Sequence, residues 1–231
     1  MPLLDLAASS SLGSLLGMRH ALEPDHLAAV TTLVTGERSG YKAAFLGVCW
    51  GLGHTISLIV AGSVLVILRA EMPVRAADAF ELCVALMLIG LGVRAIYLAA
   101  RQGPAGPAHV HHHGHTTHVH EGAPAHIHFG AWTLARRPLL VGAVHGLAGS
   151  GALTALVLTT LPTTAARLTY MVVFGLGSTL GMAALSGLLG WPLARAGQHR
   201  GVARAVSLAV GCASTMLGLV WGYPLVGKLF T

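Results

Sequence analysis

Four ionisable side chains and a proline stand close together near the start of the chain, where residues 20–26 read His20-Ala-Leu-Glu23-Pro24-Asp25-His26. This stretch interrupts an apolar segment that extends from about residue 9 to residue 34. An ionisable group in the interior of a bilayer is costly, roughly 2.5–3.5 kcal/mol for Asp on insertion scales. Several such groups inside one apolar segment therefore indicate a functional site within a membrane.

Pro24 is predicted to break the helix that this segment would otherwise form. In an unbroken helix, at about 100° per residue, His20 and Asp25 would lie roughly 140° apart and His26 would fall on the other side. Pro24 has no N–H to donate to the carbonyl of His20, so a kink or break is expected there. A broken helix that lines a cavity can turn two imidazoles, one carboxylate and a freed carbonyl toward one point.

The side chains of this stretch favour a transition metal. Imidazole with carboxylate suits divalent Ni, Co, Zn or Cu better than Mg or Ca, which prefer oxygen ligands. We therefore expect His20, Asp25 and His26 to bind the metal, with Glu23 as a further candidate. Glu23 can instead pair with Arg19, one helical turn earlier, and either histidine can be a hydrogen-bonded core residue.

Two histidines elsewhere are candidates to complete the site. His54 lies inside the second apolar segment, where residues 51–57 read Gly-Leu-Gly-His-Thr-Ile-Ser and the glycines allow close helix approach. His145 begins the stretch His-Gly-Leu-Ala-Gly-Ser-Gly in the fourth segment. We expect His54 to be a ligand and His145 a ligand or proton carrier, although a single histidine in a helix is often structural.

The composition of the whole chain predicts a membrane protein. Only 10% of the 231 residues are charged and 54% are hydrophobic, whereas a soluble domain carries roughly 25% charge. This excludes a cytosolic enzyme and a secreted disulfide scaffold. A spanning helix needs about 20 apolar residues, and the chain offers six such segments, at roughly 9–34, 43–68, 79–100, 138–161, 169–193 and 202–227. The predicted fold is an all-α integral membrane protein with a broken first helix.

The two halves of the chain resemble each other. The motif around His20 is echoed around His145, and Cys-Trp-Gly-Leu-Gly-His-Thr, which begins at Cys49, is echoed by Val-Phe-Gly-Leu-Gly-Ser-Thr, which begins at Val173. The two motifs keep nearly the same spacing in both halves, although Gly-rich apolar sequence also matches itself easily. With three spans per half, the second copy enters the membrane from the opposite side, an arrangement typical of secondary transporters. We therefore predict a three-helix repeat at 1–100, a loop at 101–137 and an inverted repeat at 138–231.

The basic residues predict the orientation in the membrane. Eight of the 14 Lys and Arg residues fall on the side of the long loop and four on the side of the termini, while two lie within segments. The positive-inside rule then places the long loop in the cytoplasm and both termini outside, in the cytoplasmic (inner) membrane of a prokaryote.

The long loop carries nine of the 14 histidines. Their irregular spacing predicts a disordered tract that binds divalent metal weakly and in many geometries, and that tunes transport without being required for it. These histidines are His109, His111, His112, His113, His115, His118, His120, His126 and His128.

The stretch from His20 to His26 matches the H-x4-D-H signature of the nickel/cobalt transporter family (NiCoT, or NicO), and Leu-Gly-His-Thr-Ile-Ser around His54 resembles its second histidine motif. The chain is most similar to the six-span UreH-type branch, which is associated with urease maturation and nickel supply. The resemblance implies metal recognition by His20, Asp25, His26 and His54. Around Ser150 and Ser178 the chain lacks the acidic motifs of larger family members, and its histidine loop resembles the efflux members.

These observations predict a permease that moves Ni²⁺, with Co²⁺ as a second candidate substrate, without a cofactor and without a nucleic-acid partner. Inward transport is expected, and nickel/cobalt efflux is the alternative within the same class. A different class, an intramembrane hydrolase, would use Ser150 as nucleophile with His145 or His54 as base. A metal sensor or storage protein built around the histidine loop is a third possibility. A functional link to urease or another nickel enzyme is also expected.

Overall fold

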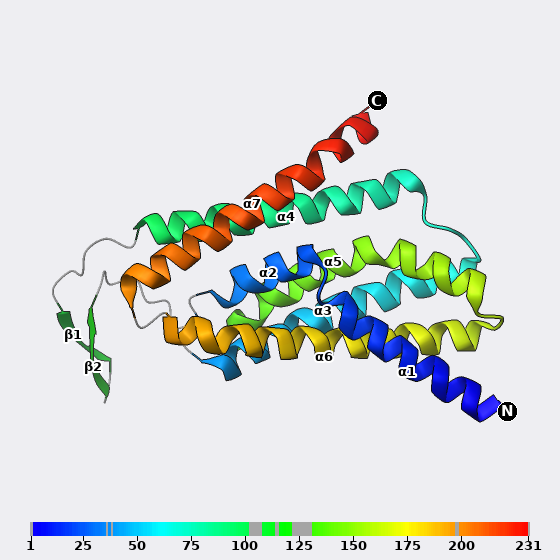
Figure 1. Ribbon diagram of the computed structural model, residues 1–231, viewed down its shortest axis with the longest axis horizontal. Coiled ribbons are helices and arrows are strands. Elements are labelled where there is room, and N and C mark those ends of the chain that lie inside the picture. Colours follow the sequence, from blue (N-terminus) through cyan, green and yellow to red (C-terminus); the bar gives the residue numbers. More distant parts are fainter. Residues whose placement is uncertain are drawn as a thin grey trace.

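The computed structural model describes residues 2–35, 37, 39–101, 108–113, 116–121, 131–196 and 199–230. These residues form seven helices and one pair of strands (Figure 1). The helices are α1 (Pro2–His20), α2 (Pro24–Val34), α3 (Gly40–Leu68), α4 (Val74–Arg101), α5 (Ala131–Thr160), α6 (Thr164–Ala196) and α7 (Arg200–Phe230), and the strands are β1 (Ala108–His113) and β2 (Thr116–Glu121).

The first apolar segment is broken where the proline predicts a break. Helix α1 ends at His20, and α2 begins at Pro24, which occupies the first turn, where its missing N–H costs nothing. Glu23 precedes it with extended backbone angles. The expectation that the His20 carbonyl would be free is wrong, because it accepts a hydrogen bond from the Glu23 backbone N–H at 3.1 Å. The break therefore contributes side chains to the site and not that carbonyl.

The long helices match the predicted segments to within a few residues. Among the described residues, α3, α4, α6 and α7 are long and apolar enough to cross a membrane. Helix α2 has 11 residues, which corresponds to about 16 Å and is too short to cross a bilayer alone. The first apolar segment is thus divided into two shorter helices, α1 and α2.

The histidine-rich loop contains an antiparallel strand pair where a disordered tract is predicted from composition. The register pairs His109 with His120 and His111 with His118. The strands contain Val110 and other β-branched residues, which favour extended backbone. Of the loop histidines, His115, His126 and His128 lie outside the described residues. Within the residues that the structure describes, the fold is thus helical apart from this strand pair.

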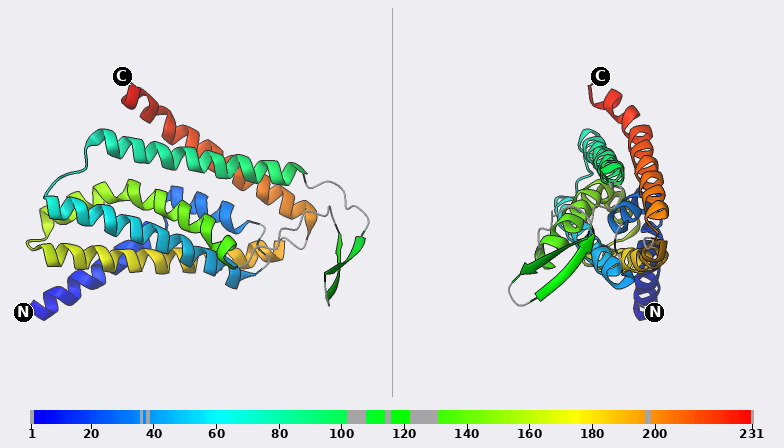
Figure 2. Two further views of the ribbon diagram at one scale, coloured as in Figure 1. Left: turned by 180° about the vertical axis from the view of Figure 1, so that it is seen from behind. Right: turned by 90° about the vertical axis from the view of Figure 1, so that its left-hand side faces the viewer.

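The helices form two groups joined by α2 (Figures 1 and 2). Helix α3 packs on α5 and α6, and α1 packs on α6, while α4 and α7 run side by side as a pair. Helix α2 lies between the groups and contacts α3, α4, α6 and α7, and α4 also contacts α5 directly. Both termini lie at one end of the long axis and the hairpin at the other. The end of α1 and the start of α2 therefore both lie in the middle of the bundle.

Small residues let α3 and α5 approach closely. A Cβ atom on Gly53 would meet the backbone carbonyl of Leu139, and a Cβ on Gly142 would meet the carbonyl of Trp50. Close backbone approach through small residues is how membrane helices associate without a hydrophobic driving force. This contact brings the middle of α3 against the middle of α5.

Candidate metal site

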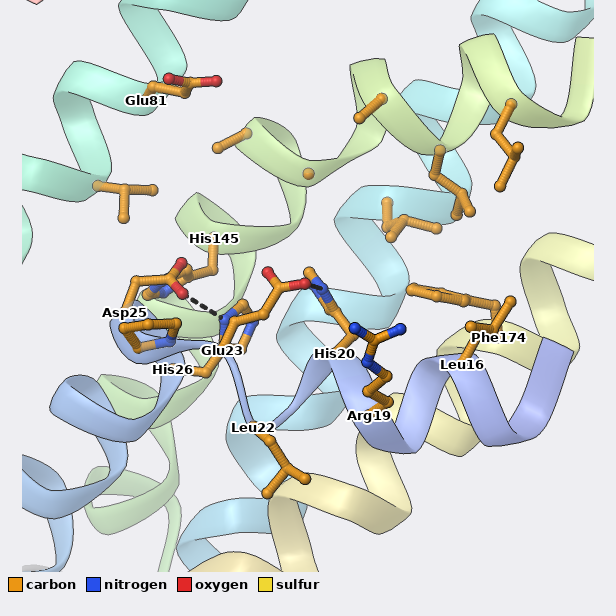
Figure 3. Close-up of a pocket in the computed structure, with 18 of the residues that line it drawn as sticks. Leu16, Arg19, His20, Leu22, Glu23, Asp25, His26, Glu81, His145 and Phe174 are labelled. Carbon is orange, nitrogen blue, oxygen red and sulfur yellow. Dashed lines mark hydrogen bonds and ion pairs between the residues drawn. The ribbon is translucent and has the colours of Figure 1, made fainter. Parts of the chain in front are cut away.

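Four helices bring ionisable side chains close together in the middle of the bundle, and Figure 3 shows those of His20, Asp25, His26 and His145. His20 is the last residue of α1, and Asp25 and His26 lie in the first turn of α2. His54 lies midway along α3 and His145 midway along α5. His26, His54 and His145 are each at most 2% exposed. The polar cluster thus lies midway along the long apolar helices α3 and α5.

Three imidazoles form the first part of this cluster. One ring nitrogen from each of His20, His26 and His54 lies within 4.8 Å of the others. The ring centroids of His20 and His26 are 4.5 Å apart, and that of His54 is 5.3 Å from His20 and 5.4 Å from His26. Two nitrogens that bind one ion at about 2.1 Å can be at most about 4.2 Å apart. Small side-chain rotations are enough to close the triad around a dication.

These imidazoles have buried nitrogens without a hydrogen-bond partner among the described residues. They are Nε2 of His20, Nε2 of His26 and both ring nitrogens of His54. An unpaired buried polar atom typically costs about 1–3 kcal/mol, so it is rare in a folded protein. Three histidines with such atoms facing one another are a donor set that fits a metal ion.

Two carboxylates hold the opposite nitrogens of two of these rings. Nδ1 of His20 lies 2.9 Å from Oε1 of Glu23, and Nδ1 of His26 lies 3.1 Å from Oδ1 of Asp25. Glu23 therefore pairs with His20 and not with Arg19. A carboxylate on one imidazole nitrogen fixes the ring and strengthens the other nitrogen as a metal donor. The acidic residues of the stretch are placed to orient histidines.

Asp25 joins the first cluster to His145. Its Oδ2 lies 3.1 Å from Nε2 of His145, while its Oδ1 contacts His26. Asp25, His26 and His145 form a second group whose potential donor atoms lie within 4.8 Å of one another. Nδ1 of His145 is buried and has no partner among the described residues. His26 belongs to both groups, so the two donor sets are adjacent.

Aromatic side chains border the cluster. The ring of Trp50 lies 5.4 Å from that of His26 and 5.7 Å from that of His145, and Phe174 lies 5.5 Å from His20. Trp50 is fully buried. Apolar walls of this kind exclude water from the imidazoles and strengthen electrostatic interactions between them and a cation.

A cavity of about 730 Å³ is lined by His20, Glu23, Asp25, His26 and His145 of the cluster, while His54 is not part of its lining. Its walls include Leu16 and Arg19 before His20 on α1, Leu156 on α5 and Tyr170 on α6. All four lie on the side of the cluster that faces the end of the molecule with both termini (Figure 1). The cavity therefore extends from the cluster toward that end.

Buried apolar residues close the opposite side of the cluster. They belong to the second half of α2, the first half of α3 and the second half of α6, and include Val30, Val34, Trp50 and Met182. These side chains are at most 1% exposed. Buried apolar residues thus lie on the hairpin side of the cluster, and the cavity lies on the side of the termini.

The structure brings together every residue that the sequence proposed for the main site: His20, Glu23, Asp25, His26, His54 and His145. The predicted alternative nucleophile Ser150 is buried, and its hydroxyl donates to the Leu147 carbonyl of its own helix at 2.7 Å. Six of the loop histidines lie in β1 and β2, outside this cavity.

Sequence reasoning missed two residues of the cavity region. Trp50 was not proposed for the site, yet its ring packs on those of His26 and His145. Glu81 on α4 lines the cavity and belongs to no motif. Its signal in the sequence is an acidic residue at the start of an apolar segment, which is itself uncommon in membrane proteins.

Comparison with known proteins identifies the family of the chain. Residues 7–223 match the family NicO, described as high-affinity nickel-transport protein. The chain is 30% identical over 226 residues to the urease accessory protein UreH of Bacillus sp. (strain TB-90), a match that covers 97% of this chain and 95% of that protein. No solved structure matches the chain significantly. A family of transporters, and not of hydrolases, therefore accounts for nearly the whole sequence: this chain belongs to the NicO family of nickel transporters.

Proposed function

We propose that the protein imports Ni²⁺, and Co²⁺ as a second substrate, across the cytoplasmic membrane of a prokaryote through the buried histidine cluster. The observation that carries this proposal is the set of unpartnered ring nitrogens of His20, His26 and His54. Three imidazoles suit either ion, and selectivity between them then depends on geometry. Similarity to a urease accessory protein supports a further proposal, that the imported nickel supplies a urease or another nickel enzyme.

The residues of the site have different roles in this proposal. His20, His26 and His54 replace water on the ion, and Glu23 and Asp25 orient two of the three rings through Nδ1. Asp25 also carries negative charge within reach of the ion. His145, hydrogen-bonded to Asp25, is the next donor as the ion moves on.

We further propose that six spans form two inverted three-helix repeats, with α1 and α2 together equivalent to α5. Reciprocal contacts between α3 and α6 support this. A Cβ on Gly51 would meet Thr179, and a Cβ on Gly175 would meet Thr55. Thr55 and Thr179 also share a hydrogen bond of 2.9 Å. In a two-fold symmetric contact, equivalent residues meet equivalent partners, as Gly51 and Gly175 do here.

Contacts of these helices with α1 and α5 are reciprocal in the same way. A Cβ on Gly53 would meet the Leu139 carbonyl, and a Cβ on Gly177 would meet the Ser14 carbonyl. Ser14 and Leu139 are related by the same shift of 125 positions as the two motif histidines at 20 and 145. The packing of α3 on α5 thus mirrors that of α6 on α1, which supports an axis through the α3–α6 contact.

The cavity and the charge bias agree on a direction. The basic residues favour the hairpin end as cytoplasmic, and the cavity extends from the cluster to the opposite end. An ion from outside would reach the imidazoles in this conformation and would need the apolar seal around Trp50 to open before release. A potential of 100 mV, negative inside, favours inward movement of a dication by about 4.6 kcal/mol.

The proposal is tested by ⁶³Ni²⁺ uptake into proteoliposomes under a potential of either sign. We expect uptake that requires a negative interior, that His26→Ala abolishes and that His199→Ala, at an exposed position, leaves unchanged. Uptake that persists in His26→Ala would contradict the site. Transport driven only by a proton gradient and directed out of the loaded compartment would contradict import and favour efflux.

A further inference from the structure

Glu81 is an unexplained carboxylate in the cavity. Three of the eight acidic residues in the chain line it, and they are Glu23, Asp25 and Glu81. The first two belong to the broken segment and pair with histidines. Glu81 comes from α4 and is partly buried, and Figure 3 shows it on that helix, apart from the cluster.

The charge of Glu81 is not offset by a neighbouring side chain. Among the described residues it has no hydrogen bond and no ion pair, whereas Asp78, one turn earlier on α4, lies 3.9 Å from Lys228. The cavity wall also carries Arg19, whose positive charge repels a dication. A carboxylate without an ionic partner on a cavity wall attracts cations into the cavity. Its free oxygens are therefore available to an ion in the cavity.

Glu81 lines the same cavity as the imidazoles of His20 and His26 but comes from another helix. It lies in the first turns of α4, and Figure 3 shows it apart from Asp25 and His145. An ion in the cavity can therefore meet Glu81 while it still has its water.

We propose that Glu81 is an outer cation-binding position, which attracts the hydrated dication and holds it through its water before the histidines remove that water. This inference rests on the proposed import function and adds a residue that the signature motifs do not contain. A carboxylate suits the role, because oxygen ligands hold hydrated cations and charged clefts raise the local cation concentration. A weak first position also lets the ion move on, as conduction requires.

The kinetic test compares Glu81→Gln with Glu71→Gln, which removes the same charge from an exposed loop residue just before α4. We expect Glu81→Gln to raise the half-saturating Ni²⁺ concentration about three- to tenfold with little change in maximal rate, most strongly at low ionic strength. Glu81→Asp keeps the charge and should keep most of the wild-type affinity for Ni²⁺. Glu71→Gln should have the same half-saturating concentration as wild type. An unchanged half-saturating concentration in Glu81→Gln would overturn the inference. An equal increase in Glu81→Gln and Glu71→Gln would overturn it as well.

A second test separates charge from structure. Glu81→Cys is made in a background in which the exposed Cys83 and Cys212 are serine, and is then treated with methanethiosulfonate reagents of either charge. We expect the sulfonate reagent to restore nickel uptake at low concentration and the ammonium reagent to reduce it further. Equal effects of the two reagents, or no modification from the side of the termini, would overturn the inference.

Failure of this inference is distinguishable from failure of the proposed function. If wild-type protein does not take up nickel, the proposed function fails. If wild type takes up nickel and Glu81→Gln has wild-type kinetics, only the outer position fails.

Discussion

The two halves of the chain treat equivalent positions differently. In the first half the helix breaks after His20, and the break delivers Asp25 and His26 to the cluster. In the second half α5 continues through the corresponding stretch and delivers His145 alone. Both halves keep the small residues on which the helices pack. The comparison teaches that packing is shared between the halves, whereas most of the proposed metal donors belong to the first.

The sharpest form of this comparison is His54 against Ser178, which occupy equivalent positions in the repeated motif and are both fully buried. We predict that His54→Ser lowers nickel uptake at least about 100-fold, because one of three imidazole donors is lost. Ser178→Ala should change uptake less than twofold, because its hydroxyl has no hydrogen-bond partner among the described residues. The measurement is uptake per amount of protein in the membrane. Equal losses in the two variants would contradict the asymmetry.

The next largest effect separates the two orienting carboxylates. Asp25 is 6% exposed and contacts two imidazoles, whereas the Glu23 side chain is 53% exposed and contacts one. We predict that Asp25→Asn weakens nickel binding about 10- to 100-fold. Glu23→Gln should cost less, because water screens an exposed pair. Titration of purified protein with Ni²⁺ checks the order, and a larger loss in Glu23→Gln would contradict it.

A third prediction tests the shared packing. Gly17 and Gly142 are equivalent in the two halves, and a Cβ on either would meet a backbone carbonyl of α6 or α3. We predict that each substitution to Ala destabilises the protein by about 1–3 kcal/mol. Gly90→Ala is the control, because a Cβ there would meet no atom within 4 Å. Thermal unfolding in detergent measures the effect, and stability of Gly142→Ala equal to that of Gly90→Ala would break the comparison.

The smallest effect is expected outside both halves. Replacement of residues 108–121, which span β1 and β2, by a Gly-Ser linker should leave nickel uptake within about threefold of wild type, because flexible linkers are tolerated in long loops. The measurement is uptake at saturating and limiting nickel. Complete loss would instead favour a function built on the loop histidines.

Much of the fold could be predicted from the sequence because membrane helices are specified locally. Apolar length indicates the spans and Pro24 indicates the break. The hairpin was not predicted, since composition predicted a disordered tract there, although Val110 and its neighbours favour strands. The expectation of a free His20 carbonyl was also wrong, because the backbone N–H of Glu23, beyond the end of the helix, donates a hydrogen bond to it.

The candidate site could be predicted in its members but not in its arrangement. Ionisable residues in apolar segments are few, so the histidines and Asp25 stand out in the sequence. Which nitrogen faces a neighbour, and which carboxylate orients which ring, depends on helix packing between distant segments. Glu81 escapes for the same reason, because only the packing of α4 places it on the cavity wall.

The central claim is that buried imidazoles of α1, α2 and α3 bind nickel together. It is tested most directly by X-ray absorption at the nickel edge, on protein that lacks residues 108–121 and carries one equivalent of Ni²⁺. We predict a spectrum with scattering from about three imidazole rings, which is lost in the variant with His20, His26 and His54 changed to alanine. A nickel shell made of oxygen alone, or one that is the same in that variant, would contradict the claim.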